Sequence, residues 1–252
     1  MIPKKIHYIW FGGKPKPPSI VATIDSWRRI LPDFEINQWD ETNVDITLHP
    51  WMARMHGQGK FAFASDWARL YILQHHGGIY LDTDVEIKRP LNPFLEHTMF
   101  WGFEYDCYLA TCIIGSCSDQ PVLAGLLKEY DAIDECIINN ALVTRYFLRE
   151  FADFRLNNQD QVLGGDLHIF GKEYFSVPSW DRSKNFSRHH GSNLWNDGQR
   201  RTSWPKALVR RLLGEILYYK LVSHKVCTTN EFYPICKRHK KVPASQTSRR
   251  EG

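Results

Sequence analysis

The first forty residues alternate between strand-like and helix-like patterns, and this alternation restricts the fold more than any other feature of the chain. Residues 6–11, I-H-Y-I-W-F, are β-branched or aromatic and stop at two glycines. Apolar residues then recur at helical spacing from Ser19, a suitable N-cap, to Leu31, and a second strand-like run spans residues 34–39. This order predicts a β-α-β unit in a largely parallel sheet covered by helices.

The later patterns continue the alternation between helices and strands. We predict helices over residues 61–76, 121–130, 141–151 and 204–222, and strands over residues 79–87 and 111–114. Gly77 and Gly78 are expected to end the first of these helices. With 252 residues and 43% hydrophobic content, the chain suits one α/β domain, which we place at residues 1–200, followed by a helical basic segment at 201–252.

Charge is distributed unevenly along the chain. Residues 200–252 hold 13 Lys and Arg against 3 Asp and Glu, a net charge of +10, which leaves −6 for residues 1–199. The acidic body argues against nucleic acid as a partner. The basic segment is compatible with two arrangements: it lies on an anionic membrane surface, or its helix packs on the domain while residues 237–241 stay in solvent.

Other features of the composition indicate the compartment. The apolar runs are far shorter than the ~20 residues that cross a bilayer. The six cysteines form no C-x-x-C pair. We therefore expect mostly free thiols in a reducing, cytoplasmic compartment and no zinc site.

Two aspartates one residue apart interrupt the apolar run G-G-I-Y-L-D-T-D-V-E-I. If residues 79–87 form one strand, Tyr80, Asp82 and Asp84 point to one face, and the residues between them pack into the sheet. Two carboxylates about 7 Å apart repel unless a positive charge lies between them. Mn²⁺ or Mg²⁺ would supply that charge and leave coordination positions for substrate phosphates. The alternative is that both aspartates lie in a solvated loop.

Three further groups are candidates for the same site. Asp66 and Arg69 share one face of a predicted helix. One interpretation is that they contact sugar hydroxyls and phosphate, and the alternative is that they form an ordinary intrahelical ion pair. Trp10 ends the first strand, where open α/β sheets place ligands, so it stacks on a nucleobase or packs in the core. His189 and His190 supply a metal ligand or a phosphate contact, or lie on the surface.

These motifs, in this order, resemble those of a known enzyme family. The blocks I-P-K-K-I-H-Y-I-W-F-G-G and A-F-A-S-D-W-A-R-L-Y-I-L-Q-H-H-G-G-I-Y-L-D-T-D-V, followed by a His-His loop, are similar to those of DXD-containing sugar transferases. That family includes the yeast initiating α-1,6-mannosyltransferase and bacterial enzymes of capsule and O-antigen synthesis, and the clostridial glucosylating toxins are distant relatives. The resemblance covers residues 1–195. It implies a GT-A fold, a nucleotide-sugar donor, Mn²⁺ or Mg²⁺, and retention of anomeric configuration.

The resemblance also implies roles for individual residues. Asp84 is expected to be the direct metal ligand, with Asp82 near the ribose and the water shell of the metal. Asp66 and Arg69 are expected to contact the donor sugar and to take part in catalysis with these aspartates. The implied nucleotide-sugar contacts are Trp10, Gly12, Gly13, Asp66, Arg69, Tyr80, Asp82, Ser192 and Trp195, and the implied metal ligands are Asp82, Asp84, His189 and His190.

We therefore predict transfer of a hexose or N-acetylhexosamine to a glycan or lipid-linked oligosaccharide, in surface polysaccharide synthesis at the inner face of the cytoplasmic membrane. UDP is favoured as the nucleotide, and GDP-mannose stays open. Two positions depart from the family pattern: Leu194 stands where relatives carry serine, and Asn139 and Asn140 stand near a common Gly-Pro. Two alternatives are a haloacid-dehalogenase-like phosphatase with Asp82 as nucleophile and a nucleotide-sugar-binding module without catalysis.

Overall fold

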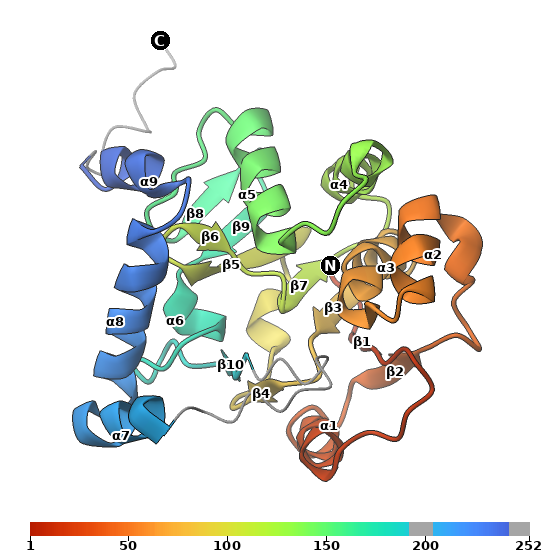
Figure 1. Cartoon of the computed structure of the whole chain (residues 1–252), viewed down its shortest axis with the longest axis horizontal. Coiled ribbons are helices and arrows are strands. Elements are labelled where there is room, and N and C mark those ends of the chain that lie inside the picture. The colour runs from red at the N-terminus through yellow and green to blue at the C-terminus, as the bar shows by residue number, and fades with distance from the viewer. Residues whose placement is uncertain (192–203, 242–252) are drawn as a thin grey trace.

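The computed structural model of the protein describes residues 1–191 and 204–241, which form a mixed sheet with helices on both faces (Figure 1). The strands of this sheet are β1 (Lys5–Ile9), β2 (Glu35–Trp39), β3 (Gly78–Leu81), β5 (Met99–Tyr105), β6 (Tyr108–Leu109), β7 (Ile113–Ser116), β8 (Gln161–Leu163) and β9 (Leu167–Phe170). Their spatial order is β2-β1-β3-β7-β5-β9-β8, with β6 paired to β5. A second, two-stranded sheet pairs β4 (Val85–Ile87) with β10 (Ser187–His189).

Most strands of the main sheet share one direction. β1 is parallel to β2 and β3, and β5 is parallel to β9. Because β7 is antiparallel to both β3 and β5, the strands β2, β1, β3, β5 and β9 all point the same way. The predicted β-α-β unit is confirmed, with α1 (Pro18–Ile30) as its helix. Ser19 lies inside this helix rather than at its cap, because Pro18 occupies a first-turn position that suits proline.

The other helices are α2 (Pro50–Gly57), α3 (Phe61–His76), α4 (Pro121–Glu129), α5 (Asn139–Glu150), α6 (Lys172–Phe175), α7 (Trp204–Leu213), α8 (Glu215–Thr228) and α9 (Tyr233–His239), with short 3-10 turns at Ile46–Leu48, Asn92–Phe94 and Tyr130–Ala132. Helix α3 has the bounds predicted for it, and Gly77 ends it with a φ of +58°. Alternate strand residues pack on opposite faces of the sheet. On β3, Ile79 and Leu81 join the hydrophobic cluster that includes α1, whereas Tyr80 joins the cluster that includes α3.

Two predicted elements are each divided in the structure. The strand expected over residues 79–87 breaks into β3 and β4 because a turn forms at residues 82–84, where the Val85 amide donates to the Asp82 carbonyl oxygen at 3.0 Å. The helix expected over residues 204–222 is interrupted by Gly214, whose φ of +72° cannot continue a helix, and α8 then runs on to Thr228.

The C-terminal helices contribute to the same core as the sheet. Cys227, Phe232 and Cys236 lie in the hydrophobic cluster that includes α3 and α5. All six cysteines are free thiols, as predicted. In the described ranges, no helix is both long enough and apolar enough to span a membrane.

Candidate active site

A cavity of about 550 Å³ lies where β3 ends and the turn at residues 82–84 begins. Its walls come from α3, β5, β6, α5, α8 and the end of β10, so segments far apart in the sequence meet there. The polar residues of the walls are Ser65, Asp66, Arg69, Asp82, Asp84, Glu104, Tyr105, Tyr108, Thr111, Asn139, Asn140 and His189. A concave site with this many convergent charged groups is the main candidate for chemistry in the molecule.

Arg69 links two of the predicted carboxylates. Its guanidinium lies 2.8 Å from Oδ1 of Asp66 and 3.3 Å from Oδ1 of Asp82, and it donates to the Thr111 carbonyl oxygen at 2.7 Å. Burial alone would lower the pKa of Arg69, but Asp82, Tyr80 and Asp66 together raise it above its usual value. Arg69 is therefore a fixed positive charge in the cavity wall, and its intrahelical pair with Asp66 is part of the site.

Asp66 is held between two helices. Its Oδ1 accepts a hydrogen bond from Nδ2 of Asn139 at 3.1 Å, and Oδ1 of Asn139 accepts one from the Tyr130 hydroxyl at 2.9 Å. Burial raises the pKa of Asp66 to about 7, although the Arg69 charge opposes this shift. The sequence singled out Asn139 only as a departure from the family pattern. The structure gives it a contact with a predicted sugar-binding residue.

The two DXD aspartates meet His189 because β4 pairs with β10. His189 stands opposite Val85 in this pairing, which places Nε2 of His189 3.4 Å from Oδ1 of Asp84. Ligand atoms of Asp82, Asp84 and His189 all lie within 4.8 Å of one another. Although the aspartates occupy a turn, their side chains are only 18% and 16% exposed, unlike those of a solvated loop. Two carboxylates and an imidazole are a donor set that fits Mn²⁺.

Glu104 fixes the orientation of His189 from the opposite side. Nδ1 of His189 donates to Oε1 of Glu104 at 2.8 Å, which leaves Nε2 facing Asp84. Burial would lower the pKa of His189, but Cys112, Glu104 and Asp84 raise it well above its usual value. Metal binding needs the neutral ring, so a cation and a proton compete for Nε2. Sequence reasoning missed Glu104, although an acid in an apolar strand is the signal that identified Asp82.

Tyr80 and His190 do not line the cavity. The Tyr80 hydroxyl donates to Oδ1 of Asp82 at 2.8 Å, and the Tyr80 side chain is buried. Tyr80 therefore positions Asp82 from within the core. Nε2 of His190 lies 3.2 Å from Oε2 of Glu86. Of the two predicted histidines, His189 is therefore the one that the fold brings to the aspartates.

The residues predicted after the first strand also lie outside the cavity walls. Trp10 follows β1, the parallel neighbour of β3, and its Nε1 donates to the Lys14 carbonyl oxygen at 2.7 Å. Gly12 and Gly13 both have positive φ, and the Gly12 amide donates to Oε1 of Glu41 at 2.5 Å. Stacking of a base on Trp10 stays a prediction. The predicted contacts Ser192 and Trp195, and the departure at Leu194, lie outside the described residues.

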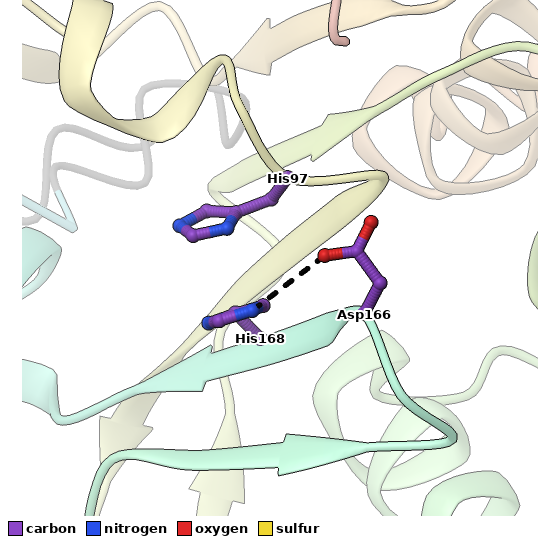
Figure 2. A group of neighbouring side chains, drawn as sticks. All are labelled: His97, Asp166 and His168. Atoms are coloured by element: carbon purple, nitrogen blue, oxygen red, sulfur yellow. Dashed lines mark ion pairs between the residues drawn. The ribbon is translucent and has the colours of Figure 1, made fainter.

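A second group of potential metal ligands lies away from the cavity, between the loop before β5 and the β8–β9 turn (Figure 2). Figure 2 shows His97 above His168, with Nε2 of His168 3.7 Å from Oδ1 of Asp166. The imidazole rings are stacked, with centroids 3.8 Å apart and planes 21° apart. Nitrogen lone pairs lie in the ring planes, so two stacked rings cannot both direct one to a metal at the usual ~2.0–2.1 Å. The stacked arrangement therefore does not suit a metal ion shared by both histidines.

Comparison with known proteins bears on the cavity directly. Residues 17–101, which include Asp66, Arg69, Asp82 and Asp84, match the family model described as "glycosyltransferase sugar-binding region containing DXD motif". An uncharacterized glycosyltransferase of Acanthamoeba polyphaga mimivirus is 26% identical over 213 residues, covering 78% of this chain and 76% of the relative. The resemblance predicted from the sequence blocks is thereby confirmed.

Two further comparisons cover smaller parts of the chain. Inositol phosphoceramide mannosyltransferase 1 of Schizosaccharomyces pombe is 29% identical over 124 residues, which is 44% of this chain and 39% of the relative. This chain therefore spans well under half of that enzyme. Among solved structures, the PaToxG glycosyltransferase superposes with a TM-score of 0.50 at 18% identity, covering 59% of this chain and 70% of that one. The predicted α/β fold is confirmed, and it is shared with this glycosyltransferase.

Proposed function

We propose that this chain transfers a sugar from a nucleotide-sugar to an acceptor hydroxyl with retention of configuration, because residues 17–101 match the DXD-containing sugar-binding region of glycosyltransferases. The sugar is a hexose or N-acetylhexosamine, carried by UDP in preference to GDP. The acceptor is a glycan or a lipid-linked saccharide of a surface polysaccharide, and the enzyme works at the inner face of the cytoplasmic membrane. The convergence of Asp82, Asp84 and His189 in one cavity is the observation that supports this proposal most.

In the proposed mechanism, Asp82, Asp84 and His189 would hold Mn²⁺ or Mg²⁺. A cation bound there would supply positive charge that stabilises the diphosphate leaving group. Arg69 adds a second positive charge that needs no reorganisation, because Asp66, Asp82 and the Thr111 carbonyl oxygen already fix it. Electrostatic stabilisation of the leaving group is therefore built into the cavity wall.

Asp66 orients the donor sugar by accepting hydrogen bonds from its hydroxyls. Asn139 lines the same cavity and holds Asp66 in place through the hydrogen bond between their side chains. The acceptor hydroxyl attacks the anomeric carbon while the bond from that carbon to the phosphate oxygen breaks. The hydroxyl proton passes to the leaving phosphate oxygen, so this step requires no protein nucleophile.

The two alternatives have less support. A phosphatase would need the Asp82 carboxylate free to attack. In the structure, this carboxylate accepts a hydrogen bond from the Tyr80 hydroxyl and forms an ion pair with Arg69. That mechanism also needs a second acidic residue beside Asp82. Asp166 is a poor candidate, because it accepts a hydrogen bond from the Thr98 amide at 2.9 Å and is not among the residues that line the cavity. A binding module without catalysis would bind the nucleotide-sugar and leave it intact, so hydrolysis of the donor distinguishes it from the transferase.

The decisive experiment compares Asp84→Asn with Glu86→Gln. Both remove one carboxylate charge from the same short segment, but only Asp84 lines the cavity. We expect Asp84→Asn to lose metal-dependent UDP binding by calorimetry and at least about 100-fold of donor hydrolysis, in keeping with the loss of a metal-centre group. Glu86→Gln should retain both activities. Full donor hydrolysis by Asp84→Asn at saturating Mn²⁺ would overturn the proposal.

A further inference from the structure

Helix α8 separates the candidate active site from a second cavity. Val226 of α8 lines the cavity that holds Asp82 and Asp84, which we call the DXD cavity. Ser223 and Cys227 of the same helix line another cavity of about 590 Å³. This second cavity, which we call the lysine cavity, is lined by Asp106, Lys172, Lys220, Ser223, His224, Cys227, Tyr233, Cys236, Lys237, Lys240 and Lys241. Figure 1 shows α8 along one side of the molecule with α9 at its end.

The lysine cavity carries an excess of positive charge. Asp106 is the one carboxylate among its lining residues, and it pairs with both Lys172 and Lys240. Burial would raise the pKa of Asp106, but these two lysines lower it, so Asp106 stays ionised and is already neutralised. Within residues 1–191 and 204–241, no carboxylate lies within ion-pair distance of Lys220, Lys237 or Lys241. The cavity therefore favours an anionic ligand.

Exposed apolar side chains border this charge. Leu217 and Leu221 lie four residues apart on α8, so they share one face, and they are 44% and 56% exposed. Lys220 lies between them in sequence, and its ammonium is 4.4 Å from the ring centroid of Trp180, which is 65% exposed. Leucine, tryptophan and lysine are the residue types of a membrane-interface contact.

This face is not the one on which apolar residues recur most regularly in the sequence. Leu208, Leu212, Ile216 and Tyr219 recur at helical spacing, but Gly214 breaks the helix between them. Ile216 and Tyr219 are half-buried, and the Tyr219 ring lies 5.5 Å from the Arg188 guanidinium. Arg188 in turn pairs with Glu215 at 2.6 Å, which fixes the start of α8 against β10. The body of the protein thus half-covers Ile216 and Tyr219 and leaves Leu217 and Leu221 outward, whereas Leu208 and Leu212 of α7 are 43% and 74% exposed.

We propose that Leu217, Leu221 and Trp180 insert into the interface of an anionic phospholipid bilayer, with a lipid phosphate group in the lysine cavity. Charge complementarity selects this occupant, because leucines alone would suit a second copy of the chain, whereas the adjacent lysines would repel those of a second copy. Because Val226 lines the DXD cavity from the same helix, bilayer binding places that cavity across α8 from the lipid phosphate group. Resting on the proposed function, this placement makes a lipid-linked saccharide the acceptor class.

The test is cosedimentation of the full chain with vesicles of phosphatidylcholine, with and without phosphatidylglycerol. We expect binding to the anionic vesicles that falls with added salt, and little binding to the neutral ones. Leu217→Ser with Leu221→Ser, and separately Lys237→Glu with Lys241→Glu, should each weaken it about tenfold or more. Val162→Ser on β8 and Lys128→Glu on α4 change equally exposed residues elsewhere and should leave binding intact.

Circular dichroism and thermal unfolding confirm that each variant is folded. Equal binding to neutral and anionic vesicles, or unchanged binding by both double variants, would overturn the proposal. So would light scattering that shows a dimer lost in Leu217→Ser with Leu221→Ser while vesicle binding persists, because the face would then join two copies. Donor hydrolysis without vesicles should be the same in all variants, and its failure in the unmodified chain would count against the proposed function alone.

Discussion

Nδ2 of Asn139 lies 3.1 Å from Oδ1 of Asp66, and this hydrogen bond joins α5 to α3 at the wall of the DXD cavity. Asn139 is only 5% exposed, and its Oδ1 accepts the Tyr130 hydroxyl, so the amide is satisfied on both sides within the protein. The position of Asp66 therefore depends on a residue 73 positions further along the chain.

We expect Asn139→Leu to raise the KM for the donor about tenfold with little change in kcat. The substitution keeps the approximate volume but leaves Asp66 without its donor, a loss of about 1–3 kcal/mol for a buried partner. Steady-state kinetics of donor hydrolysis measures both constants. Tyr130→Phe is the matched control, because it removes the outer hydrogen bond and keeps the one to Asp66. Equal effects of the two substitutions would contradict a direct role for the Asn139–Asp66 bond.

The loop after β1 supports a prediction about stability. A Cβ on Gly12 would lie 2.4 Å from Cε2 of Phe61, and the φ of Gly12 is +94°. A Cβ on Gly13 would meet nothing within 4 Å, although its φ of +64° is also positive. We expect Gly12→Ala to lower the free energy of unfolding by about 2–4 kcal/mol, and Gly13→Ala by about 1 kcal/mol from backbone strain alone.

Urea unfolding of the two glycine variants measures this difference. Combining Gly12→Ala with Phe61→Ala should cost less than the sum of the two single changes, because the truncated ring no longer meets the new methyl group. A loss of equal size in both glycine variants would show that backbone strain, and not the contact with Phe61, sets the requirement for glycine.

Burial of His7 makes the stability of the fold depend on pH. Nδ1 of His7 accepts from Nε1 of Trp39 at 3.0 Å, so its Nε2 carries the hydrogen that is donated to the Gly77 carbonyl oxygen at 2.8 Å. Burial lowers the pKa of His7 from 6.5 to about 4. Between these values the unfolded chain binds a proton that the folded chain excludes. This contribution is therefore complete above pH 6.5 and falls as the pH drops towards 4, by up to about 3 kcal/mol.

Urea unfolding at several pH values between 7.5 and 4.5 tests the His7 prediction. The slope of stability against pH should be smaller in His7→Gln than in the unmodified protein, whatever the absolute stability of the variant. His75→Gln, which removes an exposed histidine near the end of the same helix that Gly77 terminates, should keep the full slope. An unchanged slope in His7→Gln would rule out His7 as the source.

Local sequence patterns predicted which helices and strands are present better than they predicted where two of these elements are interrupted. Helix α3 and the β-α-β unit were predictable because helical spacing, a double glycine and proline act over a few residues. The turn at residues 82–84 was not, because the break depends on β4 leaving the main sheet to pair with β10, about 100 residues away in the chain. Gly214 indicated a possible helix break, but the helix was predicted across it because the apolar pattern continued on both sides.

The same distinction applies to the site. Asp66, Arg69, Asp82 and Asp84 were predicted from two short blocks, and the fold brings them together. Glu104 and Asn139 were not predicted as site residues, because each acts through a contact with another residue that only the tertiary structure creates.

The contact between Glu104 and His189 carries the last prediction. Glu104 accepts from Nδ1 of His189, so it sets which ring nitrogen is left to bind the cation beside Asp84. We expect Glu104→Ala to weaken Mn²⁺ binding by about 10–100-fold, as is usual when the partner of a metal-binding histidine is removed. Glu104→Gln keeps a carbonyl oxygen as acceptor and should recover most of this affinity. Titration of Mn²⁺ by electron paramagnetic resonance measures it without any turnover. Equal Mn²⁺ binding by Glu104→Ala and Glu104→Gln would contradict this prediction. It would show that the hydrogen bond accepted by residue 104 does not orient His189, and that β10 alone holds the imidazole.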